Sequence, residues 1–157
     1  MNVFLKVVLL LTGLFTGTQS ISQVKELYEG LASRESSLID AQLKKLENSN
    51  SPADYAYTGA LLMKKADVVK GPANKLETFR AGKEKLEKAI QEDNENVEFR
   101  FLRLLIQENA PGILGYDKNI AEDASLVAEK FNELPKEVKE VVQSYSKSSR
   151  ALRDKIK

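Results

Sequence analysis

The sequence predicts an all-α fold, because three observations agree. Apolar residues recur at spacings of three and four along most of the chain, as on one face of a helix. Proline and glycine are sparse and fall between these periodic segments, where helices end. No segment shows the alternation typical of a half-buried strand. We therefore expect one domain over residues 21–157, with about six or seven helices in antiparallel hairpins around one core.

Residues 1–20 have the pattern of a targeting segment. A single basic residue, Lys6, precedes the apolar run Val7–Phe15, and small or polar residues follow. This order is typical of a secretory signal peptide. The run is far shorter than the roughly 20 apolar residues of a spanning helix, and an uncleaved N-terminal anchor is the alternative. We expect an exported protein, periplasmic or secreted, that contacts a membrane only if this segment is retained.

Charge and composition narrow the partners and the chemistry. The chain has 24 basic and 23 acidic residues, and removal of residues 1–20 takes away only Lys6, so 23 of each sign remain. A chain without net charge offers no long-range field for nucleic acid. Histidine and cysteine are both absent, which excludes imidazole bases, thiolate nucleophiles, disulfides and the metal sites built from these residues. We expect no cofactor.

Four helical segments are expected before residue 95. The first two surround Ser33–Ser37 and are either two helices or one bent helix. A third should begin at Ser51, a natural N-cap. Gly59 lies inside this helix, where glycine costs about 1 kcal/mol relative to alanine, so we expect it to permit a close backbone approach. The fourth should begin near Asn74, whose spacing from Glu77 suits a capping box.

The segment Val97–Gln107 is apolar over most of its circumference, with Arg100 and Arg103 in one narrow polar stripe. A helix of this kind packs on several sides, so we expect it at the centre of the domain. The arginines either pair on the surface with carboxylates such as Glu122 or Asp123, worth about 0–1 kcal/mol per pair, or line a groove. In a groove, their planar guanidiniums would recognise a carboxylate or phosphate.

The remaining sequence predicts a loop and two helices. Pro111 ends the central helix and opens an ordered loop, in which Tyr116 either packs on the core or projects into a cleft. Asn119 and Glu122 have capping-box spacing and should begin the next helix. Pro135 should begin the last helix, whose apolar stripe extends to Ile156. That stripe is also a weaker candidate for oligomerisation, although it is too short to predict a coiled coil.

The stretch "YTGALLMKKAD … KLETFRAGKEKLEKAIQEDNEN" resembles a degenerate tetratricopeptide-type helical hairpin. Gly59 matches the small residue of the first helix of that repeat, and Gly82, Leu86 and Ala89 match the second helix. The Val68–Asn74 connection is longer than in a standard repeat, and a second hairpin does not keep the pattern. The resemblance implies a right-handed stack of hairpins that binds peptides or partner proteins on a concave surface. The whole chain is also similar to a family of small exported bacterial proteins, from which no mechanism follows.

Two functions of different class are open. The first, which we favour, is a non-catalytic binding or scaffold module of the bacterial cell envelope, with a helical groove for a protein or peptide. The second is a carboxylate-based, glycosidase-like hydrolase. Its candidate acid is Glu108, which lies in the apolar arc of the central helix, where burial would raise its pKa, although the last helical turn also lets it swing outward to water. No nucleophile–base set can be assembled, so we predict no catalytic residue. The candidate partner-binding residues are Arg100, Arg103, Gln107, Asn109, Tyr116 and Asn119.

Overall fold

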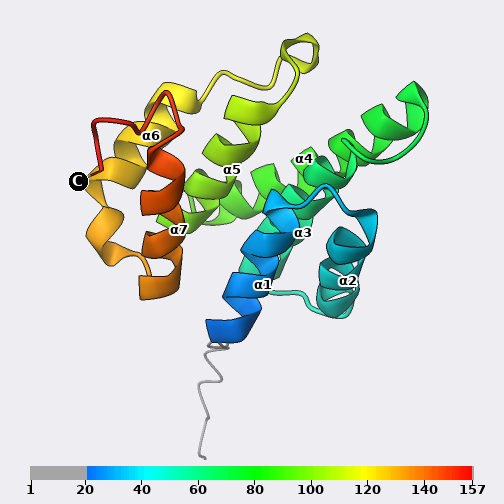
Figure 1. Cartoon of the computed structure of the whole chain (residues 1–157), viewed down its shortest axis with the longest axis horizontal. Coiled ribbons are helices and arrows are strands. Elements are labelled where there is room, and N and C mark those ends of the chain that lie inside the picture. Colours follow the sequence, from blue (N-terminus) through cyan, green and yellow to red (C-terminus); the bar gives the residue numbers. More distant parts are fainter. Residues whose placement is uncertain (1–20, 157) are drawn as a thin grey trace, which may run out of the picture.

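The computed structural model describes residues 21–156, so the predicted signal segment lies outside the described part. Over these residues the chain forms seven α-helices and two short 3-10 helices, without a strand (Figure 1). The predicted all-α class is confirmed. No helix in this part of the chain is long and apolar enough to cross a membrane. The elements are α1 (Ile21–Ala32), α2 (Ser36–Leu46), α3 (Pro52–Lys65), α4 (Pro72–Glu92), α5 (Val97–Asn109), η1 (Gly112–Leu114), α6 (Ile120–Glu129), η2 (Phe131–Glu133) and α7 (Lys136–Ser146).

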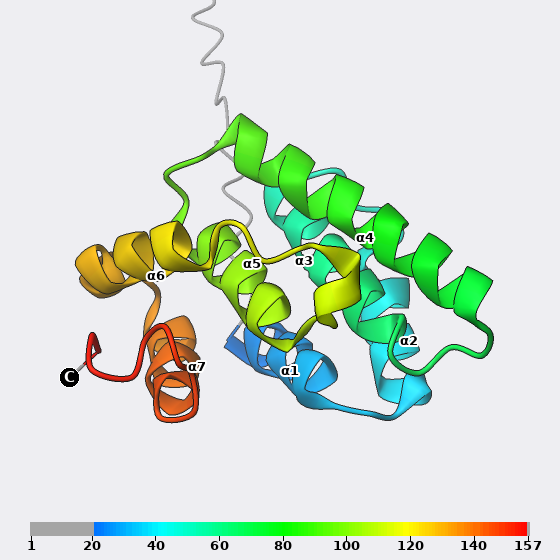
Figure 2. The same ribbon diagram turned by 90° about the horizontal axis from the view of Figure 1, so that it is seen from above.

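The α3 and α4 helices form an antiparallel hairpin that crosses at two glycines (Figure 2). A Cβ atom built on Gly59 would lie 2.6 Å from the backbone nitrogen of Leu86 and 2.7 Å from the carbonyl oxygen of Gly82. One built on Gly82 would lie 2.5 Å from the carbonyl oxygen of Gly59. The backbones therefore approach too closely for any side chain, as predicted for Gly59. The hairpin agrees with the tetratricopeptide resemblance, whereas a right-handed stack of such hairpins stays a prediction.

The helix starts were predicted with mixed success. Ser51 caps α3 as expected, because its Oγ accepts a hydrogen bond of 3.1 Å from the N–H of Asp54. The predicted capping role of Asn74 is wrong, because α4 begins two residues earlier, at Pro72, with Gly71 at the N-cap position. Proline suits the first helical position, where no N–H is needed. Asn74 lies inside the first turn, and its Nδ2 donates to the carbonyl oxygen of Lys70 over 3.0 Å.

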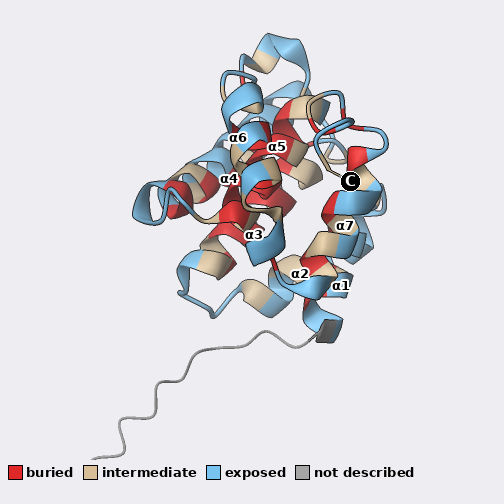
Figure 3. Ribbon diagram, turned by 90° about the vertical axis from the view of Figure 1, so that its left-hand side faces the viewer, coloured by how far each residue is buried: buried red, intermediate tan, exposed pale blue. Residues whose placement is uncertain are grey.

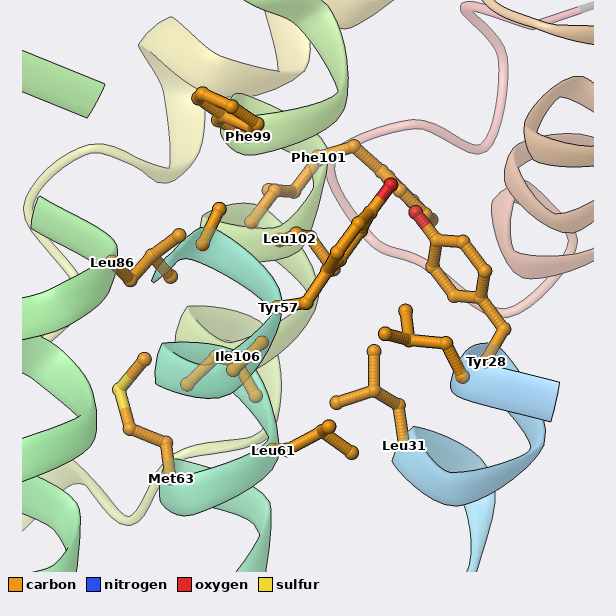
Figure 4. Close-up of a cluster of buried hydrophobic side chains, with 14 of the residues drawn as sticks. Tyr28, Leu31, Tyr57, Leu61, Met63, Leu86, Phe99, Phe101, Leu102 and Ile106 are labelled. Carbon is orange, nitrogen blue, oxygen red and sulfur yellow. The ribbon is translucent and has the colours of Figure 1, made fainter. Parts of the chain in front are cut away.

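The α5 helix lies at the centre of the described domain, as predicted. It packs against α3, α4 and α6, and Phe101 contacts Tyr28 of α1 and Tyr145 of α7, with ring centroids 6.0 and 5.8 Å apart. Figure 4 shows Phe101 and Leu102 of α5 in the same cluster as Tyr28 and Tyr57. In Figure 3, buried residues concentrate on α3 and α5, and exposed ones cover the outer helices.

Both ends of the described chain differ in detail from expectation. The α1 and α2 helices are separate rather than one bent helix, with residues 33–35 between them. The last helix, α7, begins after Pro135 as predicted but ends at Ser146, ten residues before the predicted end at Ile156. Turns follow it, and they return the fully buried Leu152 to the core.

Candidate functional site

The predicted arginine stripe of α5 forms a buried ion-pair cluster. Arg103 makes a bidentate pair with Asp123 of α6, with Nε 2.7 Å from Oδ2 and Nη2 2.8 Å from Oδ1. Its Nη1 lies 2.9 Å from Oε2 of Glu87 on α4. Arg100 pairs with Glu122, and its Nε lies 2.9 Å from Oδ1 of Asp123, although not at a hydrogen-bonding angle. The cluster joins α4, α5 and α6.

This cluster is closed to a partner. The side chains of Arg100 and Arg103 are 10% and 5% exposed, and that of Asp123 is fully buried. Burial lowers the pKa of Arg103, but its bonds to Asp123 and Glu87 outweigh this effect and hold the pKa above its usual value. The predicted pairing of the arginines with Glu122 and Asp123 is confirmed. Their predicted exposure, on the surface or in an open groove, is wrong.

Three other predicted residues line a small cleft of about 290 Å³ beside the cluster, namely Gln107, Tyr116 and Asn119. The Tyr116 hydroxyl donates to Oε1 of Glu87 over 2.6 Å, so Glu87 links this ring to Arg103. The structure therefore packs Tyr116 against the core, where it is 5% exposed. The Nε2 of Gln107 donates to Oδ1 of Asn119 over 3.4 Å. Asn119 stands at the N-cap position of α6 but makes no side-chain capping bond, so its predicted capping role is wrong.

A much larger groove, of about 1320 Å³, lies on another side of α5. The apolar groove, as we name it, lies between α1, α7, the end of α3, the start of α4 and the segment that follows α5. Asn109, the last of the predicted residues, belongs to this groove and not to the small cleft. Its apolar lining includes Leu31, Met63, Leu76, Phe79, Ile106 and Val141.

Two large apolar side chains of the apolar groove remain open to solvent. Ile113 is 95% exposed in the loop that projects beyond α5 (Figure 1), and Leu76 is 37% exposed on α4. Below them, Leu31, Met63 and Ile106 come from α1, α3 and α5 and form one buried cluster (Figure 4). Sequence reasoning missed this groove, because several segments that are far apart in the sequence each contribute only a few residues to it. The one available signal was an isoleucine beside proline and glycine in a loop.

Glu108 serves as an acceptor for the C-terminal turns. Its Oε2 accepts from the hydroxyls of Tyr145 and Ser149, over 2.9 and 2.6 Å. Its Oε1 accepts from the backbone N–H groups of Arg150 and Ala151, over 2.9 and 3.0 Å. The expectation that Glu108 swings outward to water is therefore wrong.

A second enclosed carboxylate, Glu98 of α5, was not predicted. The hydroxyls of Tyr28 and Tyr57 both donate to its Oε1, over 3.0 and 2.8 Å. Burial raises the pKa of Glu98, and burial together with the nearby carboxylate raises the pKa of each tyrosine. The three side chains come from positions 28, 57 and 98, and no sequence signal brings them together.

The chain gives no match in comparison with known proteins. No protein-family model matches it, and no curated protein or solved structure does so either. Within the described residues, no group of three or more acidic side chains is placed to hold a metal ion. A function for this chain has to be inferred from its own side chains.

Proposed function

We propose that the protein is a non-catalytic binding module of the bacterial cell envelope that holds an apolar segment of a partner protein in the apolar groove. The location is supported by the signal-like residues 1–20, and the scaffold role by the likeness of α3–α4 to a tetratricopeptide hairpin. The exposed apolar groove with Ile113 and Leu76 at its opening is the observation that carries the proposal.

Exposed apolar surface of this kind favours association. Transfer of an exposed isoleucine or leucine side chain out of water contributes about 1.5–3 kcal/mol. Large apolar patches that stay exposed on a soluble domain mark interaction sites more often than isolated apolar residues do. Leu38 of α2 is such an isolated residue, 47% exposed and outside the apolar groove. It is a matched control for Leu76.

Site-specific photo-cross-linking tests the proposal. A photoreactive phenylalanine analogue replaces Ile113 in the full-length chain, and a second variant carries it at Leu38. In cells that export the protein, we expect a discrete cross-linked product from position 113 and none from position 38. The additional change Leu76→Lys should remove the product, because it places a charge in the apolar groove.

Circular dichroism should show that Leu76→Lys leaves helicity unchanged, since Leu76 is partly exposed. The proposal is overturned if position 113 gives no product. It is equally overturned if position 38 gives the same product. A product from position 113 that is as strong with Leu76→Lys as with the control change Leu38→Lys also overturns it.

A further inference from the structure

We infer that the apolar groove takes one kind of occupant, a short amphipathic α-helix with basic residues beside its apolar face. This inference rests on the proposed function and adds the partner's secondary structure and charge. Three observations support it. They are the helical spacing of the side chains on α1 and α7, which form two walls of the apolar groove, the unpaired carboxylates of α7, and the size of the apolar groove.

The walls present side chains at helical spacing. On α1 the exposed lining residues Lys25, Glu29 and Ala32 are four and three positions apart, and on α7 Glu137, Val141 and Ser144 keep the same spacing. Each stripe spans about 10 Å, since a helix rises about 1.5 Å per residue. Ridges of side chains at this spacing accept the ridges of another helix, so a partner helix of two to three turns matches both walls.

The α7 wall is acidic and its carboxylates are free. Glu137 and Glu140 both line the apolar groove, and neither forms an ion pair within the described residues. None of the residues that α7 contributes to the lining is basic. Arg34, which follows α1, is a lining cation without a described ion pair, but it does not belong to this wall. A partner's lysine or arginine would therefore find two acceptors along α7.

Two other lining cations already have a carboxylate partner, whereas Lys75 is held by a backbone carbonyl and keeps its positive charge. Lys25 pairs with Glu29 over 3.9 Å, and Lys64 pairs with Asp67 over 3.6 Å. The Nζ of Lys75 donates to the carbonyl oxygen of Asp67 over 2.9 Å. The charge that remains available along the α7 wall is negative, and it selects against an acidic partner.

The size of the apolar groove also favours a helix. Its volume of about 1320 Å³ exceeds the roughly 300–1,000 Å³ of typical small-molecule sites. Several large side chains from one face of a helix fill such a space, as in helix-in-groove recognition. A single acyl chain would leave the two glutamates of α7 without a partner.

The test uses two blocked, fluorescent peptides of about 14 residues, a length at which an isolated helix is marginal. Both carry the same leucine face, and the polar face is lysine in one and glutamate in the other. We expect the protein to bind the lysine peptide roughly tenfold more tightly in fluorescence anisotropy, since Glu137 and Glu140 attract its lysines and repel the glutamates of the other peptide. Added salt should reduce the ratio.

Charge reversal on α7 provides the decisive variant. Glu137→Lys with Glu140→Lys should invert the peptide preference, whereas Glu84→Lys with Glu92→Lys on α4 changes net charge equally and should keep it. Equal binding of both peptides, or an unchanged preference in the α7 variant, overturns the inference. Binding of a dodecyl chain without either peptide overturns it as well. The photo-cross-linking result is independent of this charge preference, so either proposal can fail alone.

Discussion

Asp123 of α6 and Glu98 of α5 are both enclosed carboxylates, and the protein stabilises them differently. Asp123 lies within 3 Å of two guanidiniums, with bonds of 2.7 and 2.8 Å to Arg103 and a contact of 2.9 Å to Arg100. Glu98 has two tyrosine hydroxyls, at 3.0 and 2.8 Å, and no cation among its described hydrogen-bond and ion-pair partners.

Burial raises the pKa of both carboxylates, but only at Asp123 do guanidiniums oppose this effect. A cation compensates a buried carboxylate directly, and removal of either partner leaves an unpaired charge. Hydroxyl donors stabilise the ionised form only in part, so burial still raises the pKa of Glu98. The Asp123 cluster should therefore stabilise the domain through its pairing, and the Glu98 cluster should make stability fall with rising pH.

The largest effect is expected from Asp123→Asn. The change leaves two buried guanidiniums with a neutral neighbour, and broken buried pairs typically cost about 3–5 kcal/mol. The free energy of unfolding, from denaturant titration followed by circular dichroism, measures the loss. Asp117→Asn, an exposed residue of the neighbouring loop, should change it little. A loss below about 1 kcal/mol for Asp123→Asn would show that the cluster contributes no more than a surface pair.

The double change Tyr28→Phe with Tyr57→Phe should rank second. It removes both donors to Glu98, and a buried acceptor left unsatisfied costs about 1–3 kcal/mol. The loss should be greater at neutral pH, where the carboxylate is ionised, than at pH values where it is protonated. Tyr55→Phe, whose hydroxyl makes no hydrogen bond to a described carboxylate, provides the control in the same titration.

Glu98→Gln should have a smaller effect on the free energy of unfolding, and the pH dependence of that effect should have the opposite sign. Because the folded protein holds the pKa of Glu98 above its unfolded value, this group's contribution to stability is complete below the unfolded pKa. It is lost as pH rises through the folded pKa. The unfolding free energy of wild type minus that of the variant should therefore decrease from acid to neutral pH. A constant difference would mean that Glu98 is solvated as in the unfolded chain.

Glu122→Gln should have the smallest effect. The Arg100 guanidinium lowers the pKa of Glu122, so its contribution is present above the unfolded pKa and is lost as pH falls. The carboxylate is 61% exposed, and such pairs are worth about 0–1 kcal/mol and weaken in salt. The same unfolding titrations should thus give a pH slope opposite to that of Glu98→Gln. A slope of the same sign would contradict the comparison.

The sequence predicts the helices and the central place of α5, because periodicity reports which face of a helix is apolar. It also predicts the Arg100 and Arg103 pairs, since the acceptors Glu122 and Asp123 follow within about one helix and loop. It does not predict that these pairs are sealed. The burial of these pairs depends on how the loop after α5 brings α6 back against α5. This arrangement is a tertiary property and has no local sequence signal.

The clusters made from distant positions could not be predicted for the same reason. Tyr28 and Glu98 are 70 residues apart, and the apolar groove combines residues from Lys25 to Ser148. Asn74 shows a different limit of prediction from sequence. A capping-box pattern at Asn74 and a proline two residues earlier indicate different starts for the same helix. The helix begins at the proline, since its ring fixes the backbone angle φ without any partner residue.

Glu108 has a consequence for how freely the C-terminal turns can vary. Two of its four bonds come from backbone N–H groups, at Arg150 and Ala151, and every residue except proline supplies such a main-chain donor. The evolutionary constraint therefore falls on the acceptor rather than on the donors. Drift should be tolerated at 150 and 151, while position 108 admits few alternatives.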